Sequence, residues 1–262
     1  MQGASWRPLI LVLTLFFLGC TGKEPGPIGD KPGQSTDISL QLNWFPEAEH
    51  GGFYAAHVHG YFTDEGLEVD ILPGGPNSPV IAQVDLGRAT FGVVNADKML
   101  MGRDAGADVV SLMAPIQISP RCVMVHEESG IESFDQLRDV TLAVSSGSTF
   151  FPFLERQIDL KNVQIVAYSG SVAPFLNDKR YAQQGYVFSE PFVARKGGAK
   201  PRSLMVADLG FNPYASTLIT TRKTLDRDKR LAQKMTRACQ RGWAHYLKDP
   251  LETNEYITSL NP

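Results

Sequence analysis

The sequence predicts an α/β protein of two lobes, each built on a mainly parallel sheet flanked by helices. From Ile38 onward, short β-branched runs alternate with stretches of helical period, a pattern typical of parallel strands joined by helices. The alternation occurs twice, and the second series begins after the proline-bounded stretch Pro115 to Pro120. With 262 residues, 43% of them hydrophobic, the chain is long enough to bury a core in each lobe.

The first lobe is expected to contain four strands and the helices between them. Alternating or β-branched runs predict the strands, and glycine or proline residues separate them from the helical stretches. In order, the expected elements are a strand at 38–42, a helix at 52–61, a strand at 67–72, a helix at 79–86, a strand at 91–94, a helix at 97–103 and a strand at 109–114.

The second lobe follows an apolar run at 122–125 and a turn at 127–130. Its expected elements are a helix at 134–137, a strand at 141–144, a helix from 149, a strand at 163–166, a helix near 173 and a strand at 185–188. A strand at 217–221 and a long amphipathic helix at 225–247 then return to the first lobe. The expected boundaries are 38–125 for lobe 1, 126–214 for lobe 2 and 215–262 for the return. A ligand would sit between the lobes, at the carboxyl ends of the strands.

The N-terminal residues predict export. Arg7 precedes the apolar run Leu9 to Leu18, which is too short to span a bilayer and is typical of a signal peptide covering residues 1–19. The end of this run, Leu18-Gly19-Cys20, resembles a bacterial lipobox, which implies a lipid on Cys20; the alternative is an ordinary signal peptide with a chance cysteine. Residues 20–37 are rich in Gly and Pro and predict a flexible tether. We therefore expect a chain anchored by lipid to a bacterial membrane, facing the periplasm or the cell exterior.

Charge and cysteine content argue against several classes of protein. A formal net charge of -3 provides no basic field for nucleic acid. Besides Cys20, the chain has Cys122 and Cys239, for which two buried free thiols are favoured over a bridge. No metal site is predicted, because His57 and His59 are two residues apart and point to different faces of a helix.

Several motifs, taken together, resemble one known family. They are Asn43-Trp44-Phe45-Pro46, Gly60-Tyr61-Phe62, Glu65-Gly66-Leu67, Phe91-Gly92-Val93-Val94, Phe134-Asp135-Gln136-Leu137 and Tyr246-Leu247-Lys248-Asp249-Pro250. Their order resembles the family that groups thiamine-pyrimidine synthases with SsuA-like substrate-binding proteins of ABC transporters, among them proteins that bind thiamine precursors. This resemblance implies the type II periplasmic binding protein fold. Many such binding proteins run some tens of residues further, which leaves open whether their final helices are missing here.

The same resemblance raises the question of enzyme or binding protein. Yeast-type synthases carry a Lys and a His just after the third strand, for pyridoxal phosphate and ring-atom donation, and later a Cys-rich iron-binding run. Val94 to Lys98 has neither residue at the aligned places, and Ala207 to Phe211 contains no cysteine. We therefore expect a monomeric solute-binding protein without catalytic residues or cofactor. It would bind a thiamine-precursor pyrimidine or a similar small heterocycle and deliver it to an ABC permease and ATPase. The alternatives are a thiamine-pyrimidine synthase-like enzyme and a riboflavin-, sulfonate- or nitrate-binding protein.

The candidate ligand-binding residues follow the ends of predicted strands. An indole such as that of Trp44 can stack on a heterocycle, and the carboxylate of Glu190 can accept hydrogen bonds from an aminopyrimidine. Hydroxyl and amide groups of the loop 145–149 can receive a polar or anionic group. Core packing, helix capping and hinge packing are the alternative roles. The full set is Asn43, Trp44, Glu49, His50, Asn95, Ser145, Gly147, Ser148, Glu190 and Tyr214.

Overall fold

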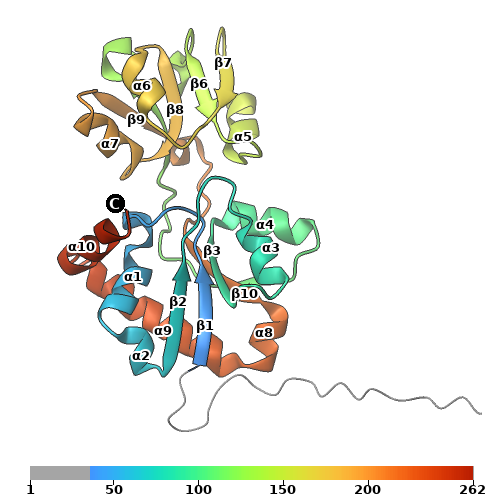
Figure 1. The fold of residues 1–262 in the computed structure, drawn as a ribbon. Coiled ribbons are helices and arrows are strands. Elements are labelled where there is room, and N and C mark those ends of the chain that lie inside the picture. The colour runs from blue at the N-terminus through green and yellow to red at the C-terminus, as the bar shows by residue number, and fades with distance from the viewer. Residues whose placement is uncertain (1–35, 262) are drawn as a thin grey trace, which may run out of the picture.

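The computed structural model describes residues 36–261, and these form two α/β lobes joined by two crossing segments (Figure 1). The first sheet has the order β2-β1-β3-β10-β4, and the second has the order β7-β6-β8-β5-β9. The predicted signal peptide, Cys20 and the tether up to residue 35 lie outside the described residues.

Lobe 1 combines an early segment of the chain with its final segment. Its strands are β1 (Thr36–Gln41), β2 (Leu67–Leu72), β3 (Phe91–Val94), β4 (Val109–Met113) and β10 (Thr217–Thr221). Its helices are η1 (Ala48–His50), α1 (Gly51–Val58), α2 (Tyr61–Asp64), α3 (Val80–Asp85), α4 (Ala96–Asp104), α8 (Arg222–Arg227), α9 (Lys229–Tyr246) and α10 (Leu251–Ser259).

Lobe 2 is formed by the middle of the chain. Its strands are β5 (Arg121–His126), β6 (Thr141–Val144), β7 (Gln164–Ala167), β8 (Tyr181–Tyr186) and β9 (Pro201–Met205). Its helices are η2 (Glu127–Ser129), η3 (Phe134–Gln136), α5 (Phe150–Gln157), α6 (Ala173–Asn177), α7 (Glu190–Lys196) and η4 (Val206–Leu209).

Both sheets are mixed in the same way. In the first, β1 pairs in parallel with β2 and β3, while β10 runs antiparallel to β3 and β4. In the second, β6 pairs in parallel with β7 and β8, while β5 runs antiparallel to β8 and β9. One strand in each sheet therefore opposes the other four, which confirms the predicted two-lobe α/β class with mainly parallel sheets.

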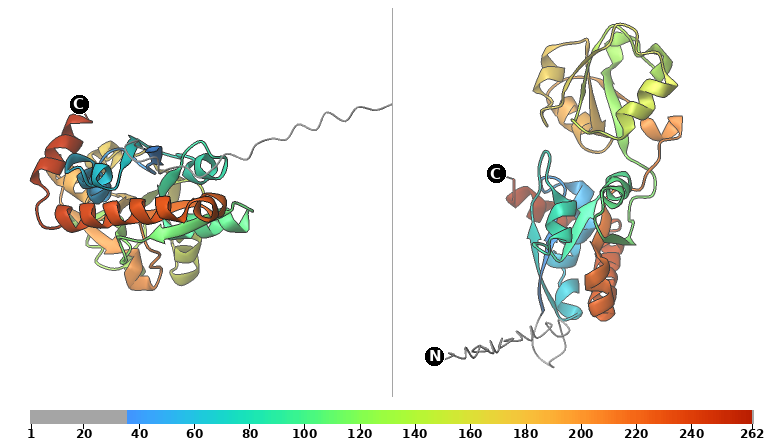
Figure 2. Two further views of the ribbon diagram at one scale, coloured as in Figure 1. Left: turned by 90° about the horizontal axis from the view of Figure 1, so that it is seen from below. Right: turned by 90° about the vertical axis from the view of Figure 1, so that its right-hand side faces the viewer.

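The predicted boundary between the lobes is corrected by the position of β5. This strand pairs with β8 and β9, so it belongs to lobe 2 and not to the end of lobe 1. The chain crosses once between β4 and β5 and again between η4 and β10, and the two crossing segments meet in an antiparallel bridge between Ile116 and Ala215. The side view in Figure 2 shows both segments on one side of the molecule, as expected of a hinge.

Several helical predictions also need correction. The long helix expected at 225–247 is two helices, because the extended backbone of Asp228 ends α8 and its side chain accepts a hydrogen bond from Leu231 N at 3.0 Å, capping α9. The helix expected at 134–137 is a single 3₁₀ turn. The strand expected at 185–188 ends at Tyr186 and begins earlier, at Tyr181. β9, α7 and α10 were not predicted.

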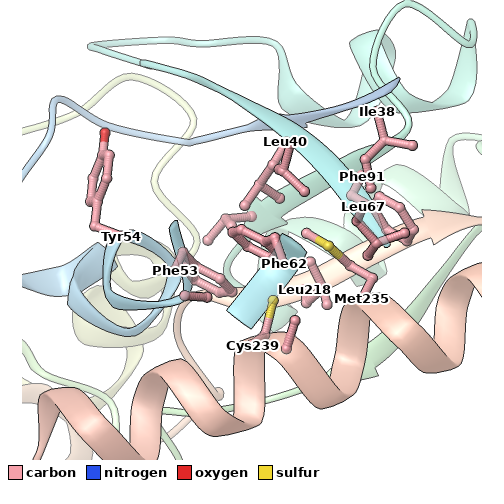
Figure 3. Packing of buried hydrophobic residues seen from close by; sticks show 14 of the residues in the cluster. Ile38, Leu40, Phe53, Tyr54, Phe62, Leu67, Phe91, Leu218, Met235 and Cys239 are labelled. Atoms are coloured by element: carbon pink, nitrogen blue, oxygen red, sulfur yellow. The ribbon is translucent and has the colours of Figure 1, made fainter. Parts of the chain in front are cut away.

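The main core of lobe 1 lies between the sheet and helices α1, α2 and α9. Leu40 and Phe91 come from the sheet, Phe53 and Phe62 come from α1 and α2, and Met235 comes from α9 (Figure 3). Figure 2 shows α9 running along the lobe beneath the sheet. Lobe 2 has its own core, in which Leu142 of β6 and Phe150 and Leu154 of α5 are fully buried. The two lobes therefore have separate cores, and the space between them is free for a site.

Helices α1 and α9 pack closely because glycine occupies their contact. A Cβ atom on Gly242 would lie 2.1 Å from Gly52 O and 2.8 Å from Ala56 Cβ, and a Cβ on Gly52 would lie 2.1 Å from the Trp243 ring. The missing side chains let the backbones approach, and this contact fixes the start of α1 and the loop before it.

Substituting Gly242→Ala is expected to destabilise the protein by about 1–3 kcal/mol, the usual cost of overpacking a tight contact. Helix propensity alone would predict a stabilisation, because alanine is the better helix former. Denaturant unfolding measures the change. Gln240→Ala, on the exposed face of α9, is the matched control and should have little effect. A Gly242→Ala variant as stable as the parent would show that the contact is not tight.

Candidate functional site

A pocket of about 740 Å³ lies between the lobes, and both lobes line it. Lobe 1 contributes the loop after β1, the start of α4 and part of α3. Lobe 2 contributes Arg121, the loop 145–149, Tyr168 and the end of β8 with Glu190. The pocket thus lies at the carboxyl ends of parallel strands, where ligands of α/β proteins bind.

The lobe 1 wall is held by a buried hydrogen-bond network. His50 Nε2 donates to Asn43 Oδ1 at 2.9 Å, and Asn43 Nδ2 donates to Glu49 Oε1 at 3.3 Å. Ser216 Oγ also donates to Glu49 Oε1, at 2.7 Å, and Ser216 N donates to Asn95 Oδ1 at 3.2 Å. Glu49 is only 3% exposed, so these donors compensate for the solvation that its carboxylate loses.

The lobe 2 wall fixes the carboxylate of Glu190 from two sides. Tyr168 OH donates to Glu190 Oε1 at 2.7 Å, and Tyr186 N donates to Oε2 at 2.7 Å. A Cβ atom on Gly185 would lie only 2.9 Å from Glu190 Oε2, so the glycine leaves the space into which the carboxylate folds back. Glu190 therefore faces the pocket in a set orientation.

Hydrogen bonds connect the two lobes across the pocket. Ser189 Oγ donates to Glu47 Oε2 at 2.9 Å, and Asn95 Nδ2 donates to Tyr186 OH at 2.5 Å. Lys98 Nζ donates to Gly147 O. Thr149 Oγ1 donates to Asp97 Oδ2. The lobes are therefore in contact around the pocket, as in a closed binding protein.

Carboxylates gather on one side of the pocket. Burial raises the pKa of Glu47 to about 8; repulsion from Glu49 and Glu190 adds to the rise, and the hydrogen bond from Ser189 opposes it. Burial also lowers the pKa of His50, although Glu49 opposes this change, so the imidazole behind Asn43 is kept neutral. The closed pocket is therefore more stable when Glu47 is protonated or when a positively charged group lies beside it.

Seven of the ten predicted site residues line the pocket. They are Asn43, Trp44, Glu49, Asn95, Ser145, Ser148 and Glu190.

The structure places the other three predicted residues elsewhere. His50 is completely buried behind Asn43 and supports it. Gly147 is not among the residues that line the pocket, and its carbonyl accepts the bond from Lys98. Tyr214 is 47% exposed in the second crossing segment, where its carbonyl accepts a hydrogen bond from Ala96 N at 2.9 Å.

Other pocket residues were missed from the sequence. Tyr186 was placed inside a strand that was predicted to continue to 188, and Arg121 begins a strand instead of ending one. Neither Glu47 nor Lys98 belongs to a sequence pattern that marks a binding site. For Glu47, the available signal was the presence of a second acidic residue, Glu49, two positions later. The missed residues include Glu47, Lys98, Arg121, Tyr168, Gln184 and Tyr186.

The two cysteines of the described residues do not contribute to the pocket. Cys122 and Cys239 are free and buried, as predicted, and neither lines the pocket. Ala207 to Phe211 covers the end of η4 and the turn after it. Among residues 36–261, no three His, Cys, Asp or Glu side chains are grouped so that they could hold a metal ion.

The raised pKa of Glu47 predicts a pH dependence of stability. A carboxyl group with a raised pKa in the folded protein contributes stability that is fully present below its unfolded pKa, near 4.5, and is lost as the pH rises through about 8. The melting temperature of the parent should therefore fall between pH 5 and pH 9, and Glu47→Gln should reduce this fall. Glu155→Gln, an exposed carboxylate on α5, is the control that should retain the parent slope. Equal slopes for Glu47→Gln and the parent would contradict the prediction.

Comparison with known proteins identifies relatives of several kinds. The chain is 24% identical over 242 residues to the riboflavin-binding protein RibY of Chloroflexus aurantiacus, covering 86% of this chain and 66% of that protein. It is 25% identical over 156 residues to the formylaminopyrimidine-binding protein of Halalkalibacterium halodurans, covering 59% of this chain and 46% of the relative. It is 25% identical over 242 residues to the 4-amino-5-hydroxymethyl-2-methylpyrimidine phosphate synthase THI11 of Saccharomyces cerevisiae, covering 85% and 71%. The chain thus spans less than two thirds of the length of the first two relatives.

Solved structures share the fold at low sequence identity. The periplasmic aliphatic sulphonate binding protein SsuA from Escherichia coli matches with a TM-score of 0.67 and 16% identity, over 85% of this chain and 74% of that chain. The Candida albicans CA3427 gene product, which exhibits the generic periplasmic binding protein fold, matches with a TM-score of 0.63 and 14% identity, over 85% and 76%. These matches confirm the predicted periplasmic binding protein fold.

Two further findings complete the comparison. None of the helices in residues 36–261 combines the length and apolar character needed to cross a bilayer.

The family described as NMT1/THI5 like matches residues 47–253, which is most of the chain. The match includes pocket residues of both lobes, although Asn43 and Trp44 precede it, and it confirms the resemblance carried by the sequence motifs. The chain therefore belongs to the NMT1/THI5-like family.

Proposed function

We propose that this protein is a solute-binding protein that encloses a small heterocycle between its lobes. The observation that carries the proposal is that Trp44 of lobe 1 and Glu190 of lobe 2 line the same pocket. An aromatic face and a fixed carboxylate on opposite lobes can both engage one flat ligand only when the lobes are closed. Ligand binding and closure would then be coupled.

The two residues have complementary roles in this proposal. Trp44 stacks on the ring of the ligand, and Glu190 accepts hydrogen bonds from ring-edge amino or ring N–H groups. Each carboxylate oxygen of Glu190 already accepts one hydrogen bond within lobe 2 and retains a second lone pair. The half-buried amide of Asn43 and the buried amide of Gln184 supply further donors and acceptors within the same pocket.

A thiamine-precursor pyrimidine is the ligand class that we propose. One relative is named as a formylaminopyrimidine-binding protein and another as a riboflavin-binding protein, and both ligands are flat heterocycles with polar edges. The acidic group of Glu47, Glu49 and Glu190 favours a ring that carries amino groups or a positive charge. The pocket volume admits either class, so riboflavin belongs in the first binding panel.

Transport is the physiological role that we propose. The protein would act as a monomer on the outer side of a bacterial membrane, held by a lipid on Cys20, and the closed form would be recognised by an ABC permease and its ATPase. Catalysis is not part of the proposal, because the donor set for the iron site of the synthases is missing from the pocket. A synthase-like activity remains the competing function, since relatives at 25–30% identity are named as synthases.

Substituting Trp44→Ala or Glu190→Gln is expected to weaken ligand binding about tenfold or more. The loss of stacking and of a charge-assisted hydrogen bond each corresponds to roughly 1–2 kcal/mol. Thermal shift selects the ligand from a panel of aminopyrimidines, riboflavin, alkanesulfonates and nitrate, since a ligand at 100 times its Kd stabilises by about 2.7 kcal/mol. Calorimetry then compares the variants.

Matched controls for this experiment are Phe192→Ala and Glu155→Gln. Phe192 is 55% exposed on α7 and Glu155 is exposed on α5, and neither lines the pocket, so both variants should bind like the parent. Unchanged affinity in Trp44→Ala and Glu190→Gln would contradict the binding mode. Formation of a pyrimidine product from pyridoxal phosphate and iron would contradict the proposed function itself.

Lipid attachment is expected to depend on Cys20. In a bacterial host, the full chain should incorporate labelled palmitate and be recovered with the membrane fraction. Cys20→Ser should abolish the label and release the protein, and Cys122→Ser is the control that should remain labelled. Labelling that persists in Cys20→Ser would contradict the proposed anchor.

A further inference from the structure

Arg121 is a cation in the pocket that the proposed function does not yet use. It begins β5, and its guanidinium carbon lies 5.1 Å from the centre of the Phe150 ring and 5.3 Å from the centre of the Tyr186 ring. The two rings hold the guanidinium in position. Within the described part of the chain, the guanidinium group of Arg121 forms no hydrogen bond and no ion pair with another residue. Its planar set of N–H donors is therefore available to a ligand.

A second cation lies close to Arg121. The ammonium group of Lys98 enters the same pocket from α4 and donates to Gly147 O. Burial lowers the pKa of Lys98; the adjacent Asp97 opposes this effect, and repulsion from Arg121 adds to it. Two cations that repel each other at the edge of a pocket favour an anion between them.

The loop between β6 and α5 completes this side of the pocket. Ser145, Ser146 and Ser148 line it, and the Ser148 hydroxyl oxygen is inaccessible to solvent and has no hydrogen-bond partner. The loop leads into the N-terminus of α5, which favours negative charge. Phe150, the first residue of that helix, is also the residue on which Arg121 stacks. The unpaired Ser148 hydroxyl, a helix start and two cations therefore lie on the same side of the pocket.

Arg121 and the carboxylate of Glu190 line the same pocket from lobe 2. Arg121 pairs with Tyr186 across the sheet, and Tyr186 N donates to Glu190 Oε2 at 2.7 Å. Among the described residues, no ion pair joins the guanidinium of Arg121 to Glu190, although both line the pocket. Both charged groups are therefore available to a ligand that carries groups of opposite charge.

We propose that the pocket takes a bipolar ligand: a heterocycle whose polar ring edge meets Glu190 and whose anionic substituent binds Arg121, Lys98 and the serine loop. The proposal rests on the proposed function and narrows its ligand class to heterocycles that carry a phosphate or a comparable anion. A cavity of about 740 Å³ has room for such a substituent beside the ring. Arg121 is then the residue that determines this specificity.

Matched ligand pairs that differ only in a phosphate test the proposal. The probes are 4-amino-5-hydroxymethyl-2-methylpyrimidine with its phosphate, and riboflavin with riboflavin 5′-phosphate, measured by calorimetry on the full chain. In at least one pair, the phosphorylated member should bind about tenfold or more tightly, as expected for a charge-assisted bidentate contact. Arg121→Gln should abolish this difference, and Arg121→Lys should retain part of it. Lys98→Gln should reduce the difference, which tests the site even if Arg121→Gln does not fold.

Arg138→Gln is the matched control, because Arg138 is exposed in lobe 2 and outside the pocket. It should leave the difference within each pair as in the parent. Equal or weaker binding of the phosphorylated members would overturn the bipolar ligand while leaving the proposed function standing. Inorganic phosphate that binds as tightly as the phosphorylated probes would overturn it as well, because the anion would then bind independently of a ring. If no heterocycle binds at all, the proposed function fails and the inference fails with it.

Discussion

The crowding of three carboxylates in one closed pocket is the constraint on which the site depends. Glu47 and Glu49 come from lobe 1, Glu190 comes from lobe 2, and closure removes water from between them. Burial raises the pKa of Glu47 to about 8, and repulsion from Glu49 and Glu190 adds to the rise. Closure without a ligand therefore favours protonation of Glu47. A ligand with amino groups or positive charge removes the same cost, so the electrostatics link occupancy to closure.

The fold explains how such a pocket is held in shape. Each lobe has an antiparallel strand that brings an additional residue to the pocket edge, since its amino end lies beside the carboxyl ends of its neighbours. Arg121 at the start of β5 is paired with Tyr186 at the end of β8. Ser216, just before β10, reaches both Glu49 and Asn95. The two hinge crossings thus supply side chains to the site as well as joining the lobes.

The same antiparallel strands explain what sequence reasoning could and could not find. Strands 67–72, 91–94, 141–144 and 217–221 were predicted with their observed bounds, because each is a short β-branched or alternating run. Asn43, Asn95 and Ser145 were predicted as site residues because they follow the ends of strands. Arg121 was not predicted, because it stands at the beginning of a strand. β9 was missed because it is an edge strand that begins with proline and has little β-branched character. Whether a strand pairs in parallel or antiparallel depends on the tertiary structure, and the local sequence pattern does not reveal it.

Each wall of the pocket is held in its shape by bonds within its own lobe, before a ligand binds. The equilibrium between open and closed lobes, in contrast, depends on individually weak interactions between the lobes. On lobe 1, part-buried hydrogen bonds from His50 to Asn43 and from Asn43 to Glu49 hold the wall, and on lobe 2 the space above Gly185 holds Glu190 in place. Such preorganised walls lose little conformational entropy on binding. The bonds across the pocket are ordinary hydrogen bonds, each with a net value of roughly 0.5–1.5 kcal/mol, and carboxylate repulsion opposes them. The open and closed forms are thus expected to differ by only a few kcal/mol, a gap that a ligand contacting both lobes can reverse.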